Sequence, residues 1–392
     1  MQVEQIYNLV NDIASEALGE SNVLSEDLSN IKMTGESIVN AIGYDNFVGK
    51  IVDKVGKVVF SSVANRKYTG RGANIIRDSW TFGSILEKLD ADMPEAKINE
   101  TWNLQDGASY DPNVYVSPEV VVKYWNNKET YRIENCFTRK QVMESFHTAE
   151  KMNAFISMLI SRVEDKFALI FEQLAERVIN VLVAETVWAE FNSGSGFSAN
   201  TGVKAVNLLK LYNDDVNTGT ALTVDEALYS KEFYRFASGV IEKYITYLRS
   251  YSTLFNVEGR ERHTDREYLN IQLHNDFYTN AKNYLYADTF HDEFVKLPSE
   301  NVEIIPFWQG SGSSFDFSDT AKIDVVTPDN HSVTITGVVA VMFDRDAVAV
   351  CNYERETESI WNPVAKFYKS FNDANFQMIV DTAENGVVFF ME

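Results

Sequence analysis

Cysteine is nearly absent from this chain of 392 residues, which contains only Cys136 and Cys351. Two cysteines so far apart provide neither a disulfide framework nor the paired spacing of a zinc site. This usage is typical of proteins that fold in a reducing compartment such as the cytoplasm.

Basic residues are also scarce, with 35 Lys and Arg against 57 Asp and Glu, a formal charge of -22 and a pI near 4.7. A surface this acidic repels phosphate backbones, so tight nucleic-acid binding is not expected to be the main function. The balance suits a protein that lies near nucleic acid without adhering to it. Hydrophobic residues at 45% and aromatics at 13% are sufficient for a sizeable core.

No stretch has the features of a signal peptide or a membrane span. The N-terminus lacks both a basic region and an apolar run. The most apolar window, 178–189, is too short to cross a bilayer and is interrupted by Asn180 and Glu185. The sequence therefore predicts a soluble intracellular protein with no membrane partner.

Proline is missing from residues 119–297, although seven prolines flank that interval. Within it, Thr138–Glu190 is the longest uninterrupted helical pattern, and steps of three and four place its apolar residues on one stripe. That stripe comprises Ile156, Ile160, Val163, Phe167, Ile170, Leu174, Val178 and Val181. Thr138 with Gln141 has capping-box spacing, and Thr148 offers a second helix start. We therefore expect either one helix from Thr138 or a short helix followed by a long one from Thr148, with the stripe of the long helix facing the C-terminal strands.

The flanks predict strands and loops. Residues 66–137 suggest a long hairpin with little core of its own, built from 120–125 and 130–137 around a turn at 126–128. Residues 203–297 are expected to be mostly helical, with aromatic stripes in the core. The C-terminal part predicts a hairpin in which 338–343 and 347–351 pair across Asp344-Arg345-Asp346.

One segment reverses the overall charge. Residues 50–77 carry seven basic residues against Asp53 alone: Lys50, Lys54, Lys57, Arg66, Lys67, Arg71 and Arg77. They form either a solvated face or a patch that meets acidic surface on a neighbouring subunit.

No constellation of residues indicates catalysis. Glu144 and His147 have the Glu-x-x-His spacing of a di-iron bundle, but no second pair completes such a site. Gly70-Arg71-Gly72 lacks the third glycine of a dinucleotide fingerprint, and His291-Asp292-Glu293 lies on a charged stretch. Nothing marks Cys136 as a nucleophile. The sequence predicts a protein that is not an enzyme, with no catalytic, cofactor-binding or metal-binding residues.

Three passages carry a resemblance to a known family. They are the apolar run 51–59, the passage 131–174 that leads from the extended segment into the long helix, and the strand–turn–strand at 338–350. Trp361-Asn362-Pro363 followed by Phe367-Tyr368 adds a fourth point. In this order the chain resembles the major capsid proteins of tailed bacteriophages with the α+β Hong Kong 97-type fold, most closely those of small short-tailed podophages.

The resemblance implies a division into an N-terminal arm (1–65), an extended loop (66–137), a peripheral domain with the spine helix (138–195 and 331–392) and an axial domain (196–330). It further implies self-assembly as hexamers and pentamers into an icosahedral head around double-stranded DNA. Expected partners are other copies, a scaffolding protein, the portal and other virion proteins, and DNA by weak contact only. Assembly is expected in the host bacterial cytoplasm.

Two alternatives remain open at this point. One is an encapsulin-type cargo shell with the same fold, and the other is a helical metal-binding enzyme.

Some relatives join subunits by a Lys–Asn isopeptide bond. Lys88, Lys97, Asn352 and Asn362 are present, but no motif supports assigning such a bond to them.

Overall fold

The computed structural model describes residues 75–77, 86–91, 102–110, 120–125, 128–138, 149–217, 219–287, 301–308 and 316–392, and isolated positions elsewhere. Most of the predicted arm, and the basic segment except Arg77, lie outside the described residues. The chain forms two compact units. Unit 1 comprises 1–82, 127–175 and 350–378, and unit 2 comprises 83–126, 176–349 and 379–392.

Unit 1 contains a four-stranded sheet in the order β1-β11-β12-β4. These strands are β1 (Ile76–Arg77), β11 (Val348–Asn362), β12 (Phe367–Val380) and β4 (Lys128–Thr138). β4 runs antiparallel to β12 over its whole length, from Lys128 opposite Gln377 to Thr138 opposite Phe367. Along β12 buried and half-buried residues alternate, as in a strand with one face on a core.

The predicted long helix is α5 (Ala149–Phe191), 43 residues, which begins directly after Thr148. Gln141 accepts from the backbone N–H of Thr138 at 2.8 Å, so the predicted capping interaction is present. In unit 1 the ring of Phe171 packs edge-on against Phe376 of β12 at 4.8 Å, and in unit 2 the side chain of Leu182 lies over Gly386 of β13. The helix therefore faces the C-terminal strands, as predicted.

The exposure of the α5 side chains refines the predicted stripe. Val163, Phe167, Ile170, Leu174 and Val178 are buried, whereas Val181 is only half-buried. Beyond residue 177 the buried positions widen beyond a single stripe, because α5 lies there among several elements of unit 2.

Unit 2 is built on a five-stranded mixed sheet in the order β5-β13-β10-β6-β7. Its strands are β5 (Ala205–Asn207), β13 (Gly386–Phe390), β10 (Val338–Asp344), β6 (Leu269–His274) and β7 (Val302–Ile305). Every residue of β6, β10 and β13 is buried, so both faces of the central strands are covered.

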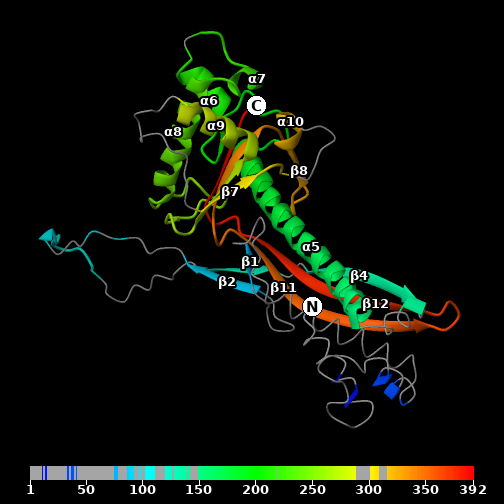
Figure 1. Cartoon of the computed structure of the whole chain (residues 1–392). Helices are drawn as coiled ribbons and strands as arrows, with labels where there is room; N and C mark the ends of the chain where they lie inside the picture. The colour runs from blue at the N-terminus through cyan, green and yellow to red at the C-terminus, as the bar shows by residue number, and fades with distance from the viewer. Residues whose placement is uncertain are drawn as a thin grey trace. The chain divides into compact units, whose positions relative to one another are not determined.

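Helices gather at one end of this sheet (Figure 1). They are α6 (Leu208–Asp215), α7 (Val224–Ala227), α8 (Lys231–Leu248) and α9 (Asn275–Ala287), and the short α10 (Phe317–Thr320) lies further along the chain. Side chains of Asn207, Thr223, Ser230 and Asp316 cap the starts of α6, α7, α8 and α10. Rings of Tyr212, Phe233 and Tyr234 pack together in the core beneath them.

Two hairpins complete unit 2: β2 (Leu86–Ala91) with β3 (Val120–Trp125), and β8 (Ile323–Val326) with β9 (Ser332–Ile335). Gly337, between β9 and β10, has φ +65°. A side chain there would place its Cβ 2.0 Å from the carbonyl oxygen of Met391. Only glycine fits this position.

The predicted pairing of 338–343 with 347–351 is wrong. A turn does follow β10, where the N–H of Ala347 donates to the carbonyl of Asp344. However, β10 is already hydrogen-bonded on both edges, to β13 and to β6. No edge remains for β11, which joins the other sheet beside β12.

The turn predicted at 126–128 is likewise not the turn of a hairpin. β3 pairs with β2, whereas β4 pairs with β12, so the hairpin of the 66–137 segment is β2–β3. β6 lies within the region predicted to be mostly helical, because LNIQLH is too short to distinguish a buried strand from a helix by its pattern. The α+β content is confirmed, and the division into arm, loop, peripheral and axial domains stays a prediction.

Candidate assembly interface

The β2–β3 hairpin has two chemically different faces. Side chains alternate across a strand, so Lys88 and Asp90 of β2 share one face with Lys123 of β3, which lies directly opposite Lys88. We call this the inner face and these three residues the hairpin root. The outer face carries Leu89 opposite Val122, next to Val120.

The inner face binds a single buried carboxylate. Lys88 pairs with one oxygen of Asp381, and the Nζ of Lys123 lies 2.7 Å from the other oxygen. The Asp381 side chain is 1% exposed. Like charges directly opposite each other weaken a two-stranded ribbon, so Lys88 and Lys123 need the counter-charge between them.

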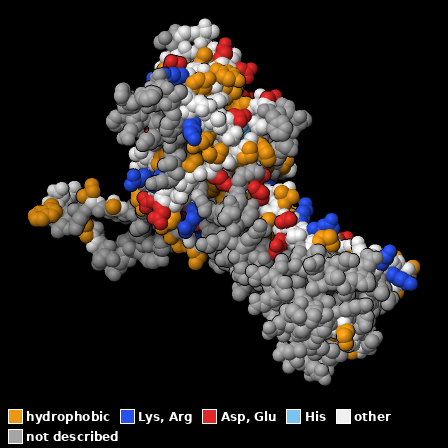
Figure 2. All heavy atoms as spheres, in the orientation of Figure 1, with side chains coloured by type: hydrophobic (Ala, Val, Ile, Leu, Met, Phe, Trp, Pro, Cys, Tyr) orange, Lys and Arg blue, Asp and Glu red, His pale blue; other side chains and the backbone are white. Residues whose placement is uncertain are grey.

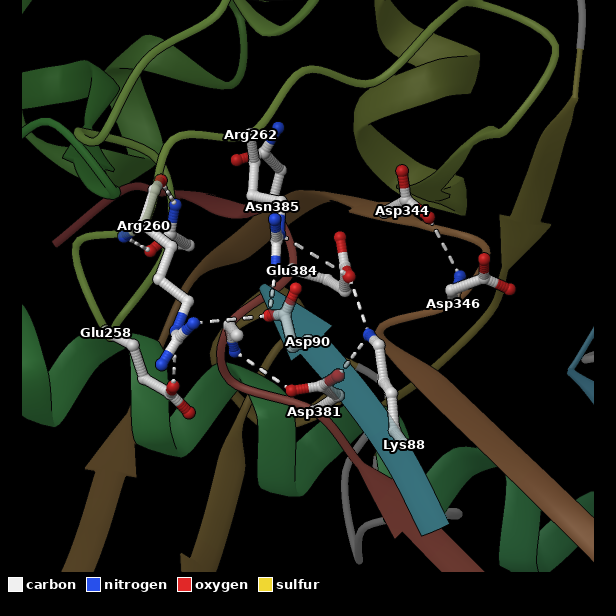
Figure 3. A network of polar contacts seen from close by, with 12 residues as sticks. Lys88, Asp90, Glu258, Arg260, Arg262, Asp344, Asp346, Asp381, Glu384 and Asn385 are labelled. Carbon is white, nitrogen blue, oxygen red and sulfur yellow. Dashed lines mark hydrogen bonds and ion pairs between the residues drawn. The ribbon is translucent and has the colours of Figure 1, made fainter. Parts of the chain in front are cut away.

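Further ion pairs surround this carboxylate (Figure 3). Lys88 also contacts Glu384 at 2.6 Å, and Lys123 also pairs with Glu258. Asp90 makes the reverse arrangement, because its carboxylate binds Arg262 and lies 3.5 Å from Arg260. Acidic and basic partners therefore hold the hairpin from the same side.

Two segments of unit 2 form the surface to which the hairpin is attached. The turn 381–385, which we call the C-terminal turn, links β12 to β13. The N–H of Val257 donates to Thr382 at 3.0 Å, and the N–H of Gly386 donates to Phe255 at 2.8 Å. These backbone bonds attach the turn to the loop that carries Glu258 and the two arginines. The indole of Trp125 adds a bond to the carbonyl of Val380 at 3.2 Å.

The pKa values follow from this arrangement. Burial acts to raise the pKa of Asp381, but the hydrogen bonds and charges of Lys123 and Lys88 outweigh it and hold that pKa below its ordinary value. Burial acts to lower the pKa of Lys88, but Asp381 and Glu384 outweigh it and raise that pKa. Both groups are therefore charged at neutral pH. A charged lysine is not a nucleophile and an ionised carboxylate cannot donate a proton, so the pair is best described as a structural ion pair.

The outer face is apolar and open to solvent. Leu89 is 68% exposed, and Val120, Val122 and Tyr124 are also exposed. The segment between the strands adds Trp102, which is 93% exposed, and Leu104. Figure 2 shows such hydrophobic side chains, in orange, at the surface of the described part of this segment. Exposed apolar residues gathered on one element are typical of a protein–protein contact.

The structure locates only some of the residues weighed for catalysis or cross-linking. Glu144, His147, Lys97 and the 70–72 and 291–293 segments lie outside the described residues, and so does the side chain of Asn352. Cys136 is exposed on β4, and Cys351 is buried on β11. Lys88 is bound to Asp381 and Glu384, and the Asn362 side chain accepts from the N–H of Val364 and Ala365 in the turn after β11.

Among the residues that the structure describes, no group of three or more His, Cys, Asp or Glu side chains could hold a metal ion. Within the same part of the chain, no helix has both the length and the apolar character needed to cross a bilayer.

Sequence reasoning did not find the ion-pair network. The ion pairs of Lys88, Asp90 and Lys123 join residues 135 to 296 positions apart, so no local spacing reveals them. The only available signals were the charge-dense stretch Glu258–Arg262 and two lysines on strands that otherwise carry mainly apolar residues.

Comparison with solved structures supports the fold. The capsid structure of Staphylococcus phage Andhra is similar, with a TM-score of 0.50 and 10% identity over 83% of this chain and 84% of that chain. The structure of the head fiber and inner core protein gp22 of native bacteriophage P68 gives a TM-score of 0.47. Its identity is 13% over 81% of this chain and 83% of that chain. The second score is below 0.5, so the fold is inferred from the first structure, and the predicted capsid-type fold is confirmed.

Among curated proteins, no relative matches the sequence. A family model described as Phi29-like phage major capsid protein matches residues 10–390, nearly the whole chain. This match confirms the predicted structural role in a phage capsid and favours neither the cargo-shell nor the metalloenzyme alternative. The chain belongs to the Phi29-like phage major capsid protein family.

Proposed function

We propose that this chain acts as a purely structural shell subunit, without catalytic activity, and that the outer face of the β2–β3 hairpin is one of its contacts with a neighbouring copy. The family match over residues 10–390 carries the capsid role. The placement of the contact rests on the hairpin, whose outer-face residues are exposed while its inner face is occupied by its own unit.

The proposed neighbour contact has a physical reason. A two-stranded ribbon is marginal in water unless a hydrophobic face is covered. Covering about 100 Å² of apolar surface contributes on the order of 2.5 kcal/mol. In a shell each contact repeats with every copy, so modest individual contacts add up over the assembly.

Electron microscopy of particles tests the proposal. The variant Val120→Lys places a charge on the outer face, and we expect it to abolish or strongly reduce particle yield while the unassembled chain stays folded. Val326→Lys is the matched control, since Val326 is also an exposed strand valine in unit 2. Equal particle yields from the two variants would overturn the proposed contact.

The remaining partners follow from the capsid role. We propose that a separate scaffolding protein guides assembly in the host bacterial cytoplasm, and that the portal and other virion proteins join the shell. The formal charge of -22 supports weak contact with the packaged DNA, since a strongly basic lining would retain it. Coexpression with and without the scaffolding protein, followed by microscopy, tests this: closed, uniform shells from the chain alone would contradict it.

A further inference from the structure

We propose that Asp381 is a positioning residue that fixes the β2–β3 hairpin through one lysine on each strand, and that this attachment is an electrostatic latch that opens without unfolding of the subunit. The inference concerns the inner face within one chain. It holds whether or not the outer face contacts a neighbour.

The geometry of the carboxylate carries the first step. Asp381 has two oxygens, and each accepts a different lysine, Lys88 from β2 and Lys123 from β3. A hairpin held through both strands cannot swing about either strand alone. Asp381 also accepts the N–H of Ala383 at 3.1 Å, which holds its carboxylate in place.

The second step is that the described contacts between the hairpin strands and the rest of unit 2 are largely polar. The inner face supplies Lys88, Asp90 and Lys123, together with the indole bond of Trp125. β3 alternates between exposed and half-buried residues and contains no fully buried one. Opening the root therefore costs the charge pairing and the partial burial of Val121 and Trp125, which share the inner face.

The third step concerns what controls the latch. The charged groups facing Asp381 balance, with four basic and three further acidic side chains in the network: Lys88, Lys123, Arg260, Arg262, Asp90, Glu258 and Glu384. The buried carboxylate of Asp344 lies beyond them, close enough for the charge of Lys88 to act on it. The Asp381–Lys88 pair stays ionised between its lowered acidic and raised basic pKa values, so neutral pH does not open it. Lys88 and Glu258 are each 30% exposed, so dissolved ions weaken the pairing at the edge of the network, while Asp381 itself is screened much less.

Hydrogen exchange of the full-length, unassembled chain tests the latch at roughly 20 mM and 500 mM salt. In the unsubstituted chain we expect amide exchange in β2 and β3 to accelerate by about tenfold at the higher salt, while exchange in β10 and β13 stays constant. In Asp381→Asn, which keeps the side-chain shape and removes the charge, exchange in the hairpin should already be fast at low salt and no longer respond to salt. Asp214→Asn, which removes an exposed ion pair with Lys210 in the same unit, is the matched control.

Three results would overturn the latch. The first is hairpin exchange in Asp381→Asn equal to that in Asp214→Asn, and the second is the absence of any salt effect in the unsubstituted chain. The third is a parallel rise in β10 and β13, which would mean general destabilisation. If Asp381→Asn does not fold, Lys123→Gln gives the same readout from the hairpin side. Because exchange is measured before assembly, a failure of the proposed neighbour contact leaves this result unaffected.

Discussion

The five-stranded sheet and the β2–β3 hairpin belong to the same unit but are stabilised by different forces. Each residue of β6, β10 and β13 is buried, so apolar burial stabilises that sheet. In the hairpin, residues 88–91 and 120–125 include no fully buried one, and ion pairs attach the strands to the rest of the unit. We therefore expect salt to affect the hairpin more than the sheet. The following predictions test that contrast, from the largest expected effect to the smallest.

The largest effect is expected at Gly337. The side chain of a valine at this position would clash with the carbonyl oxygen of Met391, and its backbone would be strained at a φ of +65°. We therefore expect the free energy of unfolding to fall by more than about 4 kcal/mol, or no soluble protein to form. Chemical denaturation measures this. Gly239 in α8 is the control, since nothing lies within 4 Å of its Cβ position, and Gly239→Ala should stabilise by up to about 1 kcal/mol. A tolerated valine at 337 would contradict the close approach.

The next effect is expected from Phe343→Ala in β10, whose side chain is buried. Removing a buried aromatic ring costs about 3–5 kcal/mol. Because the loss comes from apolar burial, urea unfolding at low and high salt should give the same difference from the unsubstituted chain. A difference that shrinks as salt rises would mean that charge also stabilises the sheet.

A smaller effect is expected on acidification. The pKa of Asp381 is held below 3.8, because the Lys123 and Lys88 contacts outweigh the effect of burial. The pKa of Glu258 is held below 4.5, because its contacts with Lys123 and Thr382 also outweigh the effect of burial. A lowered pKa in the folded state contributes stability above the unfolded value and loses it as pH falls through the folded value. Exchange protection in β2 and β3 should therefore fall below about pH 4, before protection in β10 falls. Simultaneous loss in both would contradict the contrast.

The smallest effect is expected from Asp214→Asn in α6. This residue is exposed and pairs with the partly exposed Lys210 one turn away. Such pairs contribute about 0.3–0.5 kcal/mol. Thermal unfolding should shift little, and a loss above about 1 kcal/mol would show that surface charges in this unit stabilise more than their exposure implies.

The sequence was sufficient to predict features that rest on local periodicity. The stripe of α5, the cap at Thr138 and the strand segments β3, β4 and β10 follow from patterns within a few turns or a few alternations. The capsid-type fold was predicted from the order of such segments and is confirmed by the family match and the Andhra capsid structure.

Strand pairing was not predictable in the same way. The 338–350 segment has the pattern of a hairpin, yet β10 takes β6 and β13 as partners, which come from distant parts of the chain. A local pattern reports that a strand forms but not which edges are already occupied. The ion pairs at the hairpin root escaped prediction for the same reason, because Lys88 and Asp381 are 293 positions apart.

The two-oxygen attachment at Asp381 has a consequence for folding. If β2 slipped by one residue against β3, Lys88 would no longer lie opposite Lys123. If the strand also turned over, its lysine would leave the inner face. Asp381 could then satisfy one strand but not both. The carboxylate therefore favours the alignment in which both lysines reach it, because a misaligned hairpin keeps only one of the two attachments within the subunit.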